Sequence, residues 1–269
     1  MPHVRVIVAA YQQLPFLKLT MRGYLRQTSR DFSLVIADDG SSDGTQAFLE
    51  AFACEAAAAG IAFEHHGQED RGFRKTRILN TCIREAGDEQ LFLFSDGDCI
   101  PPAAFVERHI QTHEPYSFHV GGAIRLSEEH SASLGPDDVD QGSFESMITE
   151  VDRADLRKRA RKSRWGTLLR RKNRPKVLGL NMAFDRALLE GLNGFDERFE
   201  GYGYEDSDLR DRAMRHRPRP VVKVHYGWND VFHLWHPRIA GGRAPNREYY
   251  AMKRSVFCER GLRPPDPVG

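Results

Sequence analysis

The sequence predicts an α/β fold in which a mostly parallel central sheet is flanked by helices. In the first hundred residues, short apolar stretches alternate with longer helical patterns, which is the order of βαβ units. Acidic and turn-forming residues follow several of the apolar stretches, as expected at the carboxyl ends of parallel strands, where open α/β sheets bind ligands. A chain of 269 residues is long enough for one large domain.

The elements of this first part follow one another regularly. Strands are predicted at 4–10, 32–37, 61–64 and 91–94, and helices at 14–27, at 46–59 and in a stretch that closes near Gly87. The turn formers at 38–45 include N-cap candidates for the second helix. The glycine-rich fingerprint of dinucleotide-binding sheets does not follow the first strand, so dinucleotide binding is disfavoured.

Two carboxylates lie where the fourth strand is expected to end. Asp96 and Asp98, separated by Gly97, follow the apolar stretch at 91–94. Hard oxygen ligands at a strand end suit Mg²⁺ or Mn²⁺, which complete their coordination with phosphate oxygens and water. Because Asp-x-Asp is short and common, an ordinary polar turn is the alternative.

A second acidic run, at 38–45 (DDGSSDGT), follows the second predicted strand. Asp39 could accept the N3–H of a uracil base, while Tyr11, after the first strand, covers the face of that base. Turn formation and helix capping are the alternative for Asp38, Asp39 and Asp43.

The overall composition is that of an ordinary globular protein, with 40% hydrophobic and 29% charged residues. The first ten residues do not resemble a signal peptide, and no apolar run reaches about 18 residues, so we expect a cytoplasmic protein without a membrane span. The four scattered cysteines predict reduced thiols rather than a cysteine-based zinc site.

Charge is distributed unevenly along the chain. The segment 152–176 holds twelve Lys or Arg and two Asp, a net charge of +10 in a chain of net charge +1. Trp165, Leu168 and Leu169 lie among these basic residues, a mixture that suits peripheral contact with anionic lipid on the inner face of a membrane. A solvated charged insertion is the alternative. Nucleic acid is not expected as a partner, because no recognised binding motif accompanies the charge.

Together, the motifs at 6–11 (VIVAAY), 38–45 and 96–98 resemble, in order and spacing, those of family 2 glycosyltransferases of GT-A fold. The resemblance implies a Rossmann-like sheet, a nucleotide-sugar donor and a metal, Mn²⁺ or Mg²⁺, ligated by Asp98. Arg74 falls where such enzymes often carry a basic residue that faces the nucleotide, with Arg77 as the competing candidate. The residues implied to contact the donor are Ala10, Tyr11, Asp39, Arg74, Arg77, Asp96, Gly97 and Asn181.

Motifs of the second half extend this resemblance. The stretches 179–184 (GLNMAF), 193–196 (NGFD) and 201–209 (GYGYEDSDL) are similar to the acceptor half of the subgroup of β-1,4-galactosyltransferases, polypeptide N-acetylgalactosaminyltransferases and bacterial chondroitin polymerases. The resemblance implies that Asp206 is the general base and that Glu205 lies against a sugar. The subgroup often has Trp before this acidic pair, where this chain has Tyr202 and Tyr204, so the sugar-stacking surface differs.

The residues around Asp206 are consistent with a base. Gly201 and Gly203 allow tight backbone bends, and the helical pattern at 209–215 places Asp206 at the start of a rigid element. A positioned carboxylate can take a proton from an acceptor hydroxyl. The alternative is that Asp206 or Ser207 merely caps the helix.

Two histidines in the stretch 231–237 (VFHLWHP) are the last candidate metal ligands. Imidazole suits Mn²⁺ better than Mg²⁺. Related transferases place a His on the metal after the Glu-Asp helix, and His233 matches that position best. His236 is the competing ligand, or a contact of the diphosphate, and a structural histidine is the alternative for His233.

The sequence thus predicts one GT-A domain over 1–269, with a nucleotide-sugar-binding half at 1–100 and a continuous acceptor-binding, catalytic half at 101–269. The predicted function is metal-dependent, inverting transfer of a hexosyl or N-acetylhexosaminyl group from a nucleotide sugar, with a UDP-sugar as the expected donor. The acceptor would be a glycan or lipid-linked glycan in surface polysaccharide or lipopolysaccharide biosynthesis. The alternatives are a sugar nucleotidyltransferase, which is expected to carry a glycine-rich phosphate loop and a Lys near the N-terminus, and a catalytically silent glycan-binding module.

Overall fold

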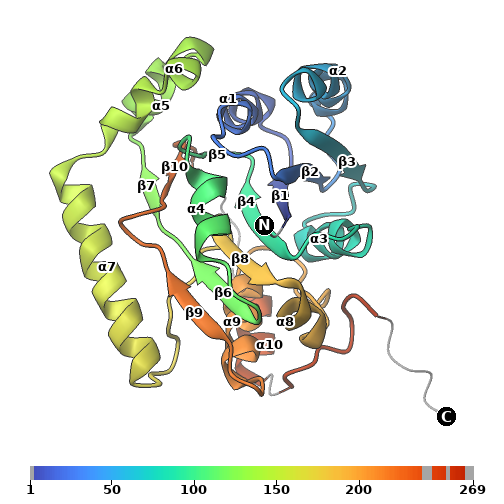
Figure 1. Ribbon diagram of the computed structural model, residues 1–269. Coiled ribbons are helices and arrows are strands. Elements are labelled where there is room, and N and C mark those ends of the chain that lie inside the picture. The colour runs from blue at the N-terminus through green and yellow to red at the C-terminus, as the bar shows by residue number, and fades with distance from the viewer. Residues whose placement is uncertain (1–2, 238–243, 253–254, 264–269) are drawn as a thin grey trace.

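A seven-stranded sheet forms the centre of the molecule (Figure 1). The computed structural model describes residues 3–237, 244–252 and 255–263. The strand order is β3-β2-β1-β4-β8-β6-β9, and β8 alone runs antiparallel to its neighbours within this described sheet. The predicted fold class, a mostly parallel sheet flanked by helices, is confirmed.

The first half of the chain builds the sheet from β3 to β4. Its elements occur in the predicted order, with ends that move by a few residues: β1 Val4–Ala10, α1 Leu14–Leu25, β2 Phe32–Asp38, α2 Thr45–Ala58, β3 Ala62–Gly67, α3 Lys75–Arg84 and β4 Leu91–Asp96. The parallel register places Ala10 beside Asp38 and Ala9 beside Asp96. The acidic residues at the strand ends therefore meet at one edge of the sheet.

The second half completes the large sheet and adds a small one. The elements are β5 Cys99–Ile100, α4 Phe105–Thr112, β6 Ser117–Val120, β7 Ala123–Arg125, α5 Glu128–Ser133, α6 Pro136–Gln141, the 3₁₀ helix η1 Ser143–Met147, α7 Glu150–Leu168, β8 Met182–Asp185, α8 Arg186–Gly191, α9 Glu205–Arg215, β9 Val221–Val224, β10 Val231–His233 and α10 Ala244–Met252. The small sheet has the order β5-β10-β7. Since β10 pairs with β5, the C-terminal histidines lie beside the residues that follow β4.

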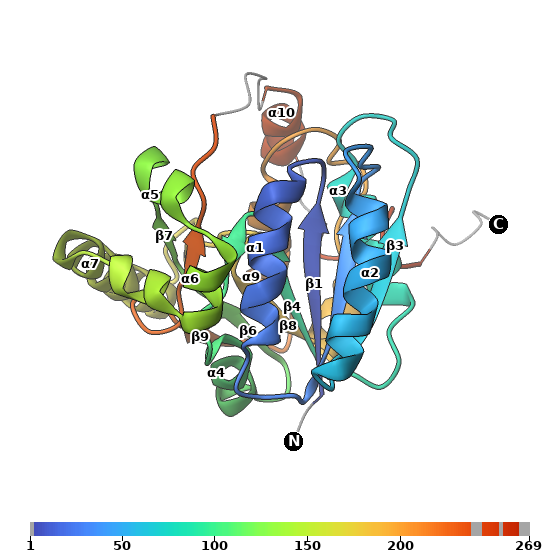
Figure 2. The same cartoon turned by 90° about the horizontal axis from the view of Figure 1, so that it is seen from above.

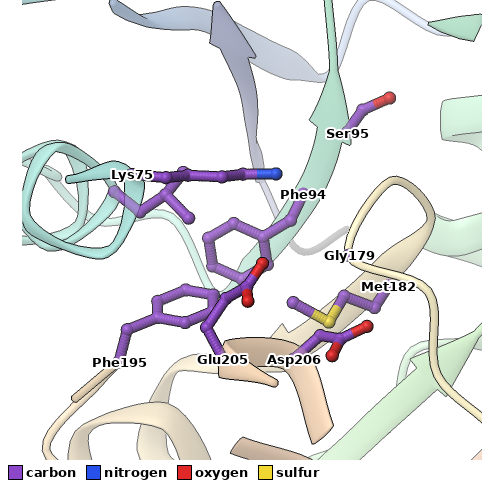
Figure 3. Close-up of a pocket in the computed structure, with 9 residues that line it drawn as sticks. Lys75, Phe94, Ser95, Gly179, Met182, Phe195, Glu205 and Asp206 are labelled. Carbon is purple, nitrogen blue, oxygen red and sulfur yellow. The ribbon is translucent and has the colours of Figure 1, made fainter. Parts of the chain in front are cut away.

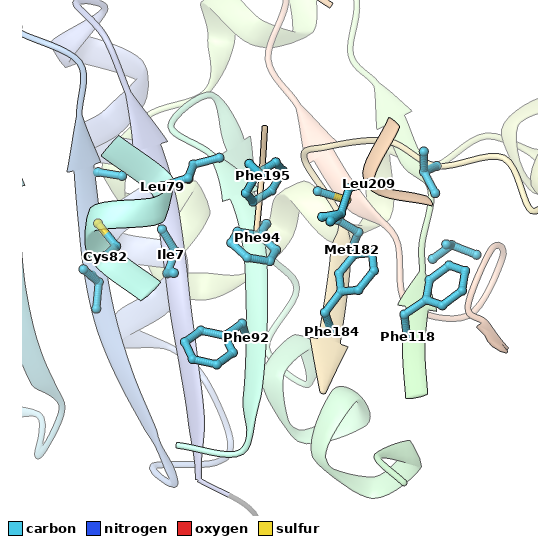
Figure 4. Packing of buried hydrophobic residues seen from close by; sticks show 14 of the residues in the cluster. Ile7, Leu79, Cys82, Phe92, Phe94, Phe118, Met182, Phe184, Phe195 and Leu209 are labelled. Atoms are coloured by element: carbon cyan, nitrogen blue, oxygen red, sulfur yellow. The ribbon is translucent and has the colours of Figure 1, made fainter. Parts of the chain in front are cut away.

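The core has two layers because side chains alternate along each strand. Val6 and Leu93 pack on the face that carries α1, α2 and α4, whereas Ile7 and Phe94 pack on the opposite face against α3 and α9. Figure 2 shows α1 and α2 on either side of β1, and Figure 4 shows the opposite layer, in which Phe92 and Phe94 of β4, Met182 and Phe184 of β8 and Phe118 of β6 lie on one face of the sheet. Burial on both faces explains the nearly continuous apolar runs in the sequence.

The basic segment is largely helical. Helix α7 begins with a capping box in which Thr149 Oγ1 accepts from the Asp152 N–H at 3.1 Å and the Thr149 N–H donates to Asp152 at 3.0 Å. One face packs on the protein through Leu156, Ala160, Ser163 and Gly166. The helix is therefore docked along one side, and its C-terminal end presents apolar side chains outward. Among the described residues, no helix is long and apolar enough to cross a membrane.

Candidate functional site

The carboxyl ends of β1, β2 and β4 bring the predicted donor-binding residues together. The Asp39 N–H donates to Ala10 O at 2.9 Å, and the Gly97 N–H donates to Ala9 O at 2.8 Å. These bonds continue the sheet register past the strand ends. Tyr11, Asp39 and Asp96 therefore lie along one edge, as the sequence predicted for ligand contacts.

The carboxylate of Asp39 is buried, with 3% of the residue exposed. One oxygen accepts from the Arg74 N–H at 2.7 Å, and the other accepts from the Gln68 side chain. Burial raises the pKa of Asp39, and the bonds from Gln68 and Arg74 oppose that rise. Since each carboxylate oxygen has a second lone pair, Asp39 can still accept from a ligand.

Tyr11 lies beside Asp39 with an exposed ring. Its residue is 45% exposed, and its hydroxyl donates to Asp70 Oδ2 at 3.1 Å. Gly40 lets the loop that carries Asp70 close over this edge: its φ is +98°, and a Cβ there would lie 2.6 Å from the Asp70 nitrogen. The exposed ring face is thus held next to a buried acceptor, the arrangement expected for stacking on a base.

Asp98 and two histidines form the candidate metal centre. His236 Nε2 lies 3.2 Å and His233 Nε2 lies 3.8 Å from Asp98 Oδ2, and Cys99 Sγ contacts Asp98 Oδ1 at 3.2 Å. Burial by itself would raise the pKa of Asp98, but the two histidines bring it below its ordinary value; the bond to Asp98 in turn raises the pKa of His236. One carboxylate oxygen and two imidazole nitrogens within 4.8 Å of one another fit a divalent cation such as Mn²⁺.

Helix α9 presents the acidic pair at its first turn. Gly201 and Gly203, as expected, adopt positive φ (+81° and +94°), and Tyr204, at +76°, is the N-cap. Neither Asp206 nor Ser207 is therefore the N-cap residue, but Asp206 Oδ1 accepts from the Ser207 N–H at 2.5 Å in the first turn of the helix. Asn246 of α10 supports the turn, because its amide donates to the carbonyls of Gly201 and Gly203 at 3.1 and 3.0 Å.

A small pocket lies between α3, β4 and α9 (Figure 3). Lys75 and Glu205 project into it from α3 and α9, with Asp206 at one side. The Lys75 ammonium bonds to Asp96 Oδ1. The other residues that line the pocket are Leu79, Phe94, Ser95, Gly179, Met182 and Phe195.

The charges in this pocket influence one another. Burial and the nearby charge of Asp206 raise the pKa of Glu205 well above its ordinary value, while Lys75 opposes the rise. The Glu205 Oε2 atom is buried and has no hydrogen-bond partner among the described residues. A protonated or unpaired carboxyl facing a pocket is available to a ligand hydroxyl.

Three residues that were predicted to contact the donor do not point their side chains into this pocket. Arg77 is exposed on α3. Arg74 uses its N–H for Asp39 and its guanidinium for Glu69 O. Asn181 is fully buried and donates to Gly122 O and Asn229 O at 2.9 and 2.8 Å. Their donor contacts stay predictions.

Lys75 is the site residue that the sequence analysis missed. It directly follows Arg74 in the stretch 72–75 (GFRK) and begins α3. The start of a helix is an unfavourable place for the positive charge of a Lys, because the helix dipole is positive there. That conflict is the signal in the sequence, and the bond to Asp96 is its structural explanation.

Two family models match the chain. The model described as glycosyl transferase family 2 matches residues 5–187, and the model described as the N-terminal domain of galactosyltransferase matches residues 167–236. The first covers more than half of the chain, including the strand-end acids, and the second includes the α9 turn and the candidate metal-binding histidines.

Two curated proteins are among the relatives. The uncharacterized glycosyltransferase YfnE of Bacillus subtilis is 27% identical over 261 residues, which are 82% of this chain and 64% of that protein. Validoxylamine A glucosyltransferase of Streptomyces hygroscopicus subsp. jinggangensis is 24% identical over 237 residues, 84% of this chain and 55% of that protein. The chain thus spans less than two thirds of the length of these relatives.

Solved structures share the fold at low sequence identity. The mannosyltransferase PcManGT of Pyrobaculum calidifontis, in complex with GDP-Man and Mn²⁺, has a TM-score of 0.59 at 20% identity and covers 88% of this chain and 58% of its own. Staphylococcus aureus TarS 1–349 with UDP has a TM-score of 0.60 at 16% identity and covers 87% and 61%. GalNAc-T7 with UDP, GalNAc and Mn²⁺ has a TM-score of 0.58 at 11% identity and covers 88% and 44%.

Proposed function

The chain belongs to glycosyl transferase family 2, and from this premise we propose that it transfers a sugar from a UDP-sugar, with a divalent metal and inversion at the anomeric carbon. The single observation that carries the proposal is the convergence of three groups on one edge of the sheet: the buried Asp39, the Asp98–histidine centre and the acidic pair on α9. Each has the chemistry that one part of the reaction requires.

The nucleotide is proposed to lie across the ends of β1 and β2. The exposed ring of Tyr11 would cover the base, and Asp39 would accept the uracil N3–H. Structures of the same fold have been solved with UDP and with GDP-Man, so a donor of this class suits the fold. Uracil is the proposed base because each Asp39 oxygen, which already accepts one bond from Gln68 or Arg74, keeps a lone pair that can accept the N3–H.

The metal is proposed to be Mn²⁺, or Mg²⁺, held by Asp98 with His233 and His236. The donor set of one carboxylate and two imidazoles fits this assignment, and Mn²⁺ accompanies the nucleotide or donor sugar in two solved structures of the fold. When bound, such a metal would offset the negative charge that develops on the leaving diphosphate. Lys75 and Asp96, next to this centre, are proposed to face the donor sugar.

Asp206 is proposed as the general base. It would accept the proton of the acceptor hydroxyl while the hydroxyl oxygen bonds to the anomeric carbon and the carbon–diphosphate bond breaks, its electron pair leaving with the diphosphate. A single displacement of this kind inverts the anomeric centre. Glu205, whose raised pKa favours the protonated form, would donate to a sugar oxygen.

The roles of the two halves of the chain and the identity of the acceptor are also proposals. Residues 1–100 would bind the donor, and residues 101–269 would supply the base and the acceptor surface. A lipid-linked glycan of surface polysaccharide biosynthesis is the proposed acceptor, because α7, within the catalytic half, carries a basic surface with exposed Trp165 and Leu168. The protein would then act in the cytoplasm, at the inner membrane face.

Two substitutions test the reaction by separating donor binding from transfer. In calorimetry with UDP-sugars and Mn²⁺, Asp98→Ala should weaken metal-dependent binding, because it removes the carboxylate ligand. Asp206→Asn should bind the donor normally but transfer sugar roughly 10²- to 10⁴-fold more slowly, the usual contribution of a general base. The surface variant Asp137→Asn is the matched control and should behave like the unmodified protein.

Three results would contradict the proposal. Near-normal transfer by Asp206→Asn would remove this residue as the base and leave Glu205 and Asp208 as the next candidates. Formation of a sugar nucleotide from a nucleoside triphosphate would indicate a nucleotidyltransferase. Glycan binding without turnover of any nucleotide sugar would indicate a silent binding module.

A further inference from the structure

Three histidines lie together on the face of the sheet that α4 covers, outside the proposed transfer site. This histidine cluster consists of His109 of α4, His119 of β6 and His225, which directly follows β9; each is at most 2% exposed. One nitrogen of each lies within 4.8 Å of the others, and the ring centroids are 4.9 to 5.2 Å apart. Figure 1 shows the three elements side by side. The transfer reaction uses none of these side chains.

The hydrogen bonds of His225 leave one ring nitrogen with a buried, unused lone pair. When Thr112 Oγ1 donates its only hydrogen to Arg108 O, at 2.9 Å, it accepts from His225 Nε2 across 3.0 Å. In that arrangement, the ring proton of His225 lies on Nε2 and Nδ1 carries none. This atom is buried and has no hydrogen-bond partner among the described residues. A buried acceptor without a donor costs free energy that a bound cation would recover.

The Nδ1 atoms of the other two histidines lie about as far apart as two nitrogen ligands of one metal ion. His109 Nδ1 and His119 Nδ1 are 3.0 Å apart. The Asn181 amide nitrogen donates to two main-chain carbonyls, whereas Asn181 Oδ1 and His109 Nε2 are both buried and have no hydrogen-bond partner among the described residues. With its proton on Nε2, His109 would keep a lone pair on Nδ1. In His119, Nε2 lies 3.4 Å from the Ser117 hydroxyl, so the ring proton can reside on either nitrogen.

We propose that the histidine cluster binds one divalent cation of the zinc class through the three Nδ1 atoms. Tetrahedral zinc with Zn–N bonds of about 2.0–2.1 Å holds its nitrogens about 3.3 Å apart, close to the 3.0 Å between His109 and His119. Each Nε2–H would donate outward, to Asn181, Ser117 or Thr112, as metal-bound histidines usually do. Binding requires that the His119 proton move from Nδ1 to Nε2 and that the nearly parallel rings of His109 and His119 turn, so that their Nδ1 lone pairs converge on the cation.

The surroundings suit this site. Burial keeps the pKa of all three histidines below its ordinary value, so the neutral, metal-binding form prevails. The nearby charge of Lys223, which would oppose a cation, is paired with Glu114. The fourth position would be filled by water, as in zinc sites with three histidines. Because the ligands come from three separate elements, the cation would fasten α4 to β6 and to the segment after β9.

The test uses protein without a polyhistidine tag and an Asp98→Ala background, which removes the candidate metal centre of the transfer site. After incubation with Zn²⁺ and gel filtration, mass spectrometry should find about one equivalent of zinc. His225→Gln and His119→Gln in the same background should each lose most of it. His113→Gln is the matched control, because His113 lies nearby but bonds to Asp185. This variant should retain its zinc.

A second measurement does not depend on variants of the cluster. Added Zn²⁺ at about 100 times its Kd should raise the Tm of the Asp98→Ala protein by roughly 5–10 °C, and Co²⁺ should give the absorption bands of a tetrahedral nitrogen site. If that protein retains no zinc and its Tm does not respond, the cluster is a network of neutral hydrogen-bonded histidines and the proposal is overturned. Neither outcome bears on the transfer reaction.

Discussion

At the scale of single residues, burial and neighbouring charges decide which carboxylates can do chemistry. Asp38 is held by its own turn, because its Oδ1 accepts from the Ser41 N–H and hydroxyl at 2.8 and 2.7 Å. Asp39, one residue later, is buried and keeps lone pairs for a ligand. On α9, Glu205 is buried next to Asp206, and its pKa rises. Adjacent acids thus acquire different roles from their surroundings alone.

The raised pKa of Glu205 predicts a pH-dependent stability. The folded protein holds this proton more tightly than the unfolded chain does. The free energy of unfolding therefore falls as the pH rises from about 4.5, the pKa of Glu205 in the unfolded chain, through its raised pKa in the folded protein. Glu205→Gln abolishes this loss. In urea unfolding, the variant should therefore gain stability relative to the unmodified protein between pH 5 and pH 8.5, by about 1.4 kcal/mol for each unit of pKa elevation.

Glu85→Gln, which changes an exposed residue on the turn after α3, is the control. Its stability relative to the unmodified protein should not change with pH. A stability difference for Glu205→Gln that stays constant with pH would mean that Glu205 is ionised throughout, and its proposed role as a hydrogen donor to sugar would then fail.

At the scale of elements, α7 packs on the protein along one face and exposes apolar side chains to solvent near its C-terminal end. Its buried side has small and aliphatic residues at 156, 160, 163 and 166, the spacing of one helix face. Near the C-terminal end, Trp165 and Leu168 are 62% and 70% exposed, and Leu169, just after the helix, is 57% exposed. The basic residues of the segment surround them. Exposed apolar side chains within a positive field are typical of a surface that meets anionic lipid.

Liposome sedimentation tests this surface. The protein should bind vesicles that contain anionic lipid, and binding should fall as salt is added, because the charges are screened. The double variant Trp165→Ser/Leu168→Ser should bind roughly tenfold more weakly, since less apolar area is buried. Val151→Ser, at the acidic start of the same helix and 79% exposed, is the control. Equal binding to neutral and anionic vesicles would leave α7 as an ordinary solvated surface.

At the scale of the whole molecule, a buried arginine connects several elements of the first half of the chain. Arg5 of β1 is 1% exposed; it donates to Cys82 O of α3 and to Glu89, just before β4, both at 2.9 Å, and to Glu64 of β3. Burial by itself would raise the pKa of Glu89, but bonds from Ser33 and Arg5 lower it. One cation thus satisfies groups from three other segments at the edge opposite the proposed site.

Removal of this cation should destabilise the molecule globally. Arg5→Met leaves Glu89 buried without its charged partner, so the free energy of unfolding should fall by about 3–5 kcal/mol, the usual cost of breaking a buried pair on one side. Urea unfolding measures this. Arg84→Met, which removes a partly exposed guanidinium on α3, should cost less than about 1 kcal/mol. Equal effects of the two substitutions would show that the Arg5 network is not specially stabilising.

The sequence by itself determined the strands and the acids at their ends. Alternation along the chain is local, so apolar runs such as 91–94 and the turn formers that follow them predict strands and their carboxyl ends directly. Because parallel strands end at a common edge, the proximity of Tyr11, Asp39 and Asp96 followed from the fold class. The glycines before Asp206 likewise predicted a bend that the structure contains.

Only the tertiary structure decided which distant side chains meet. Lys75 bonds to Asp96 because α3 packs beside the end of β4, and His236 lies closer to Asp98 than His233 does after β10 pairs with β5. Both are long-range contacts that no local pattern encodes. The histidine cluster shows the same limit: its members come from a helix, a strand and a loop, and carried no legible signal in sequence. Periodicity records which face of an element is buried, whereas packing between elements determines what each buried polar group finds there.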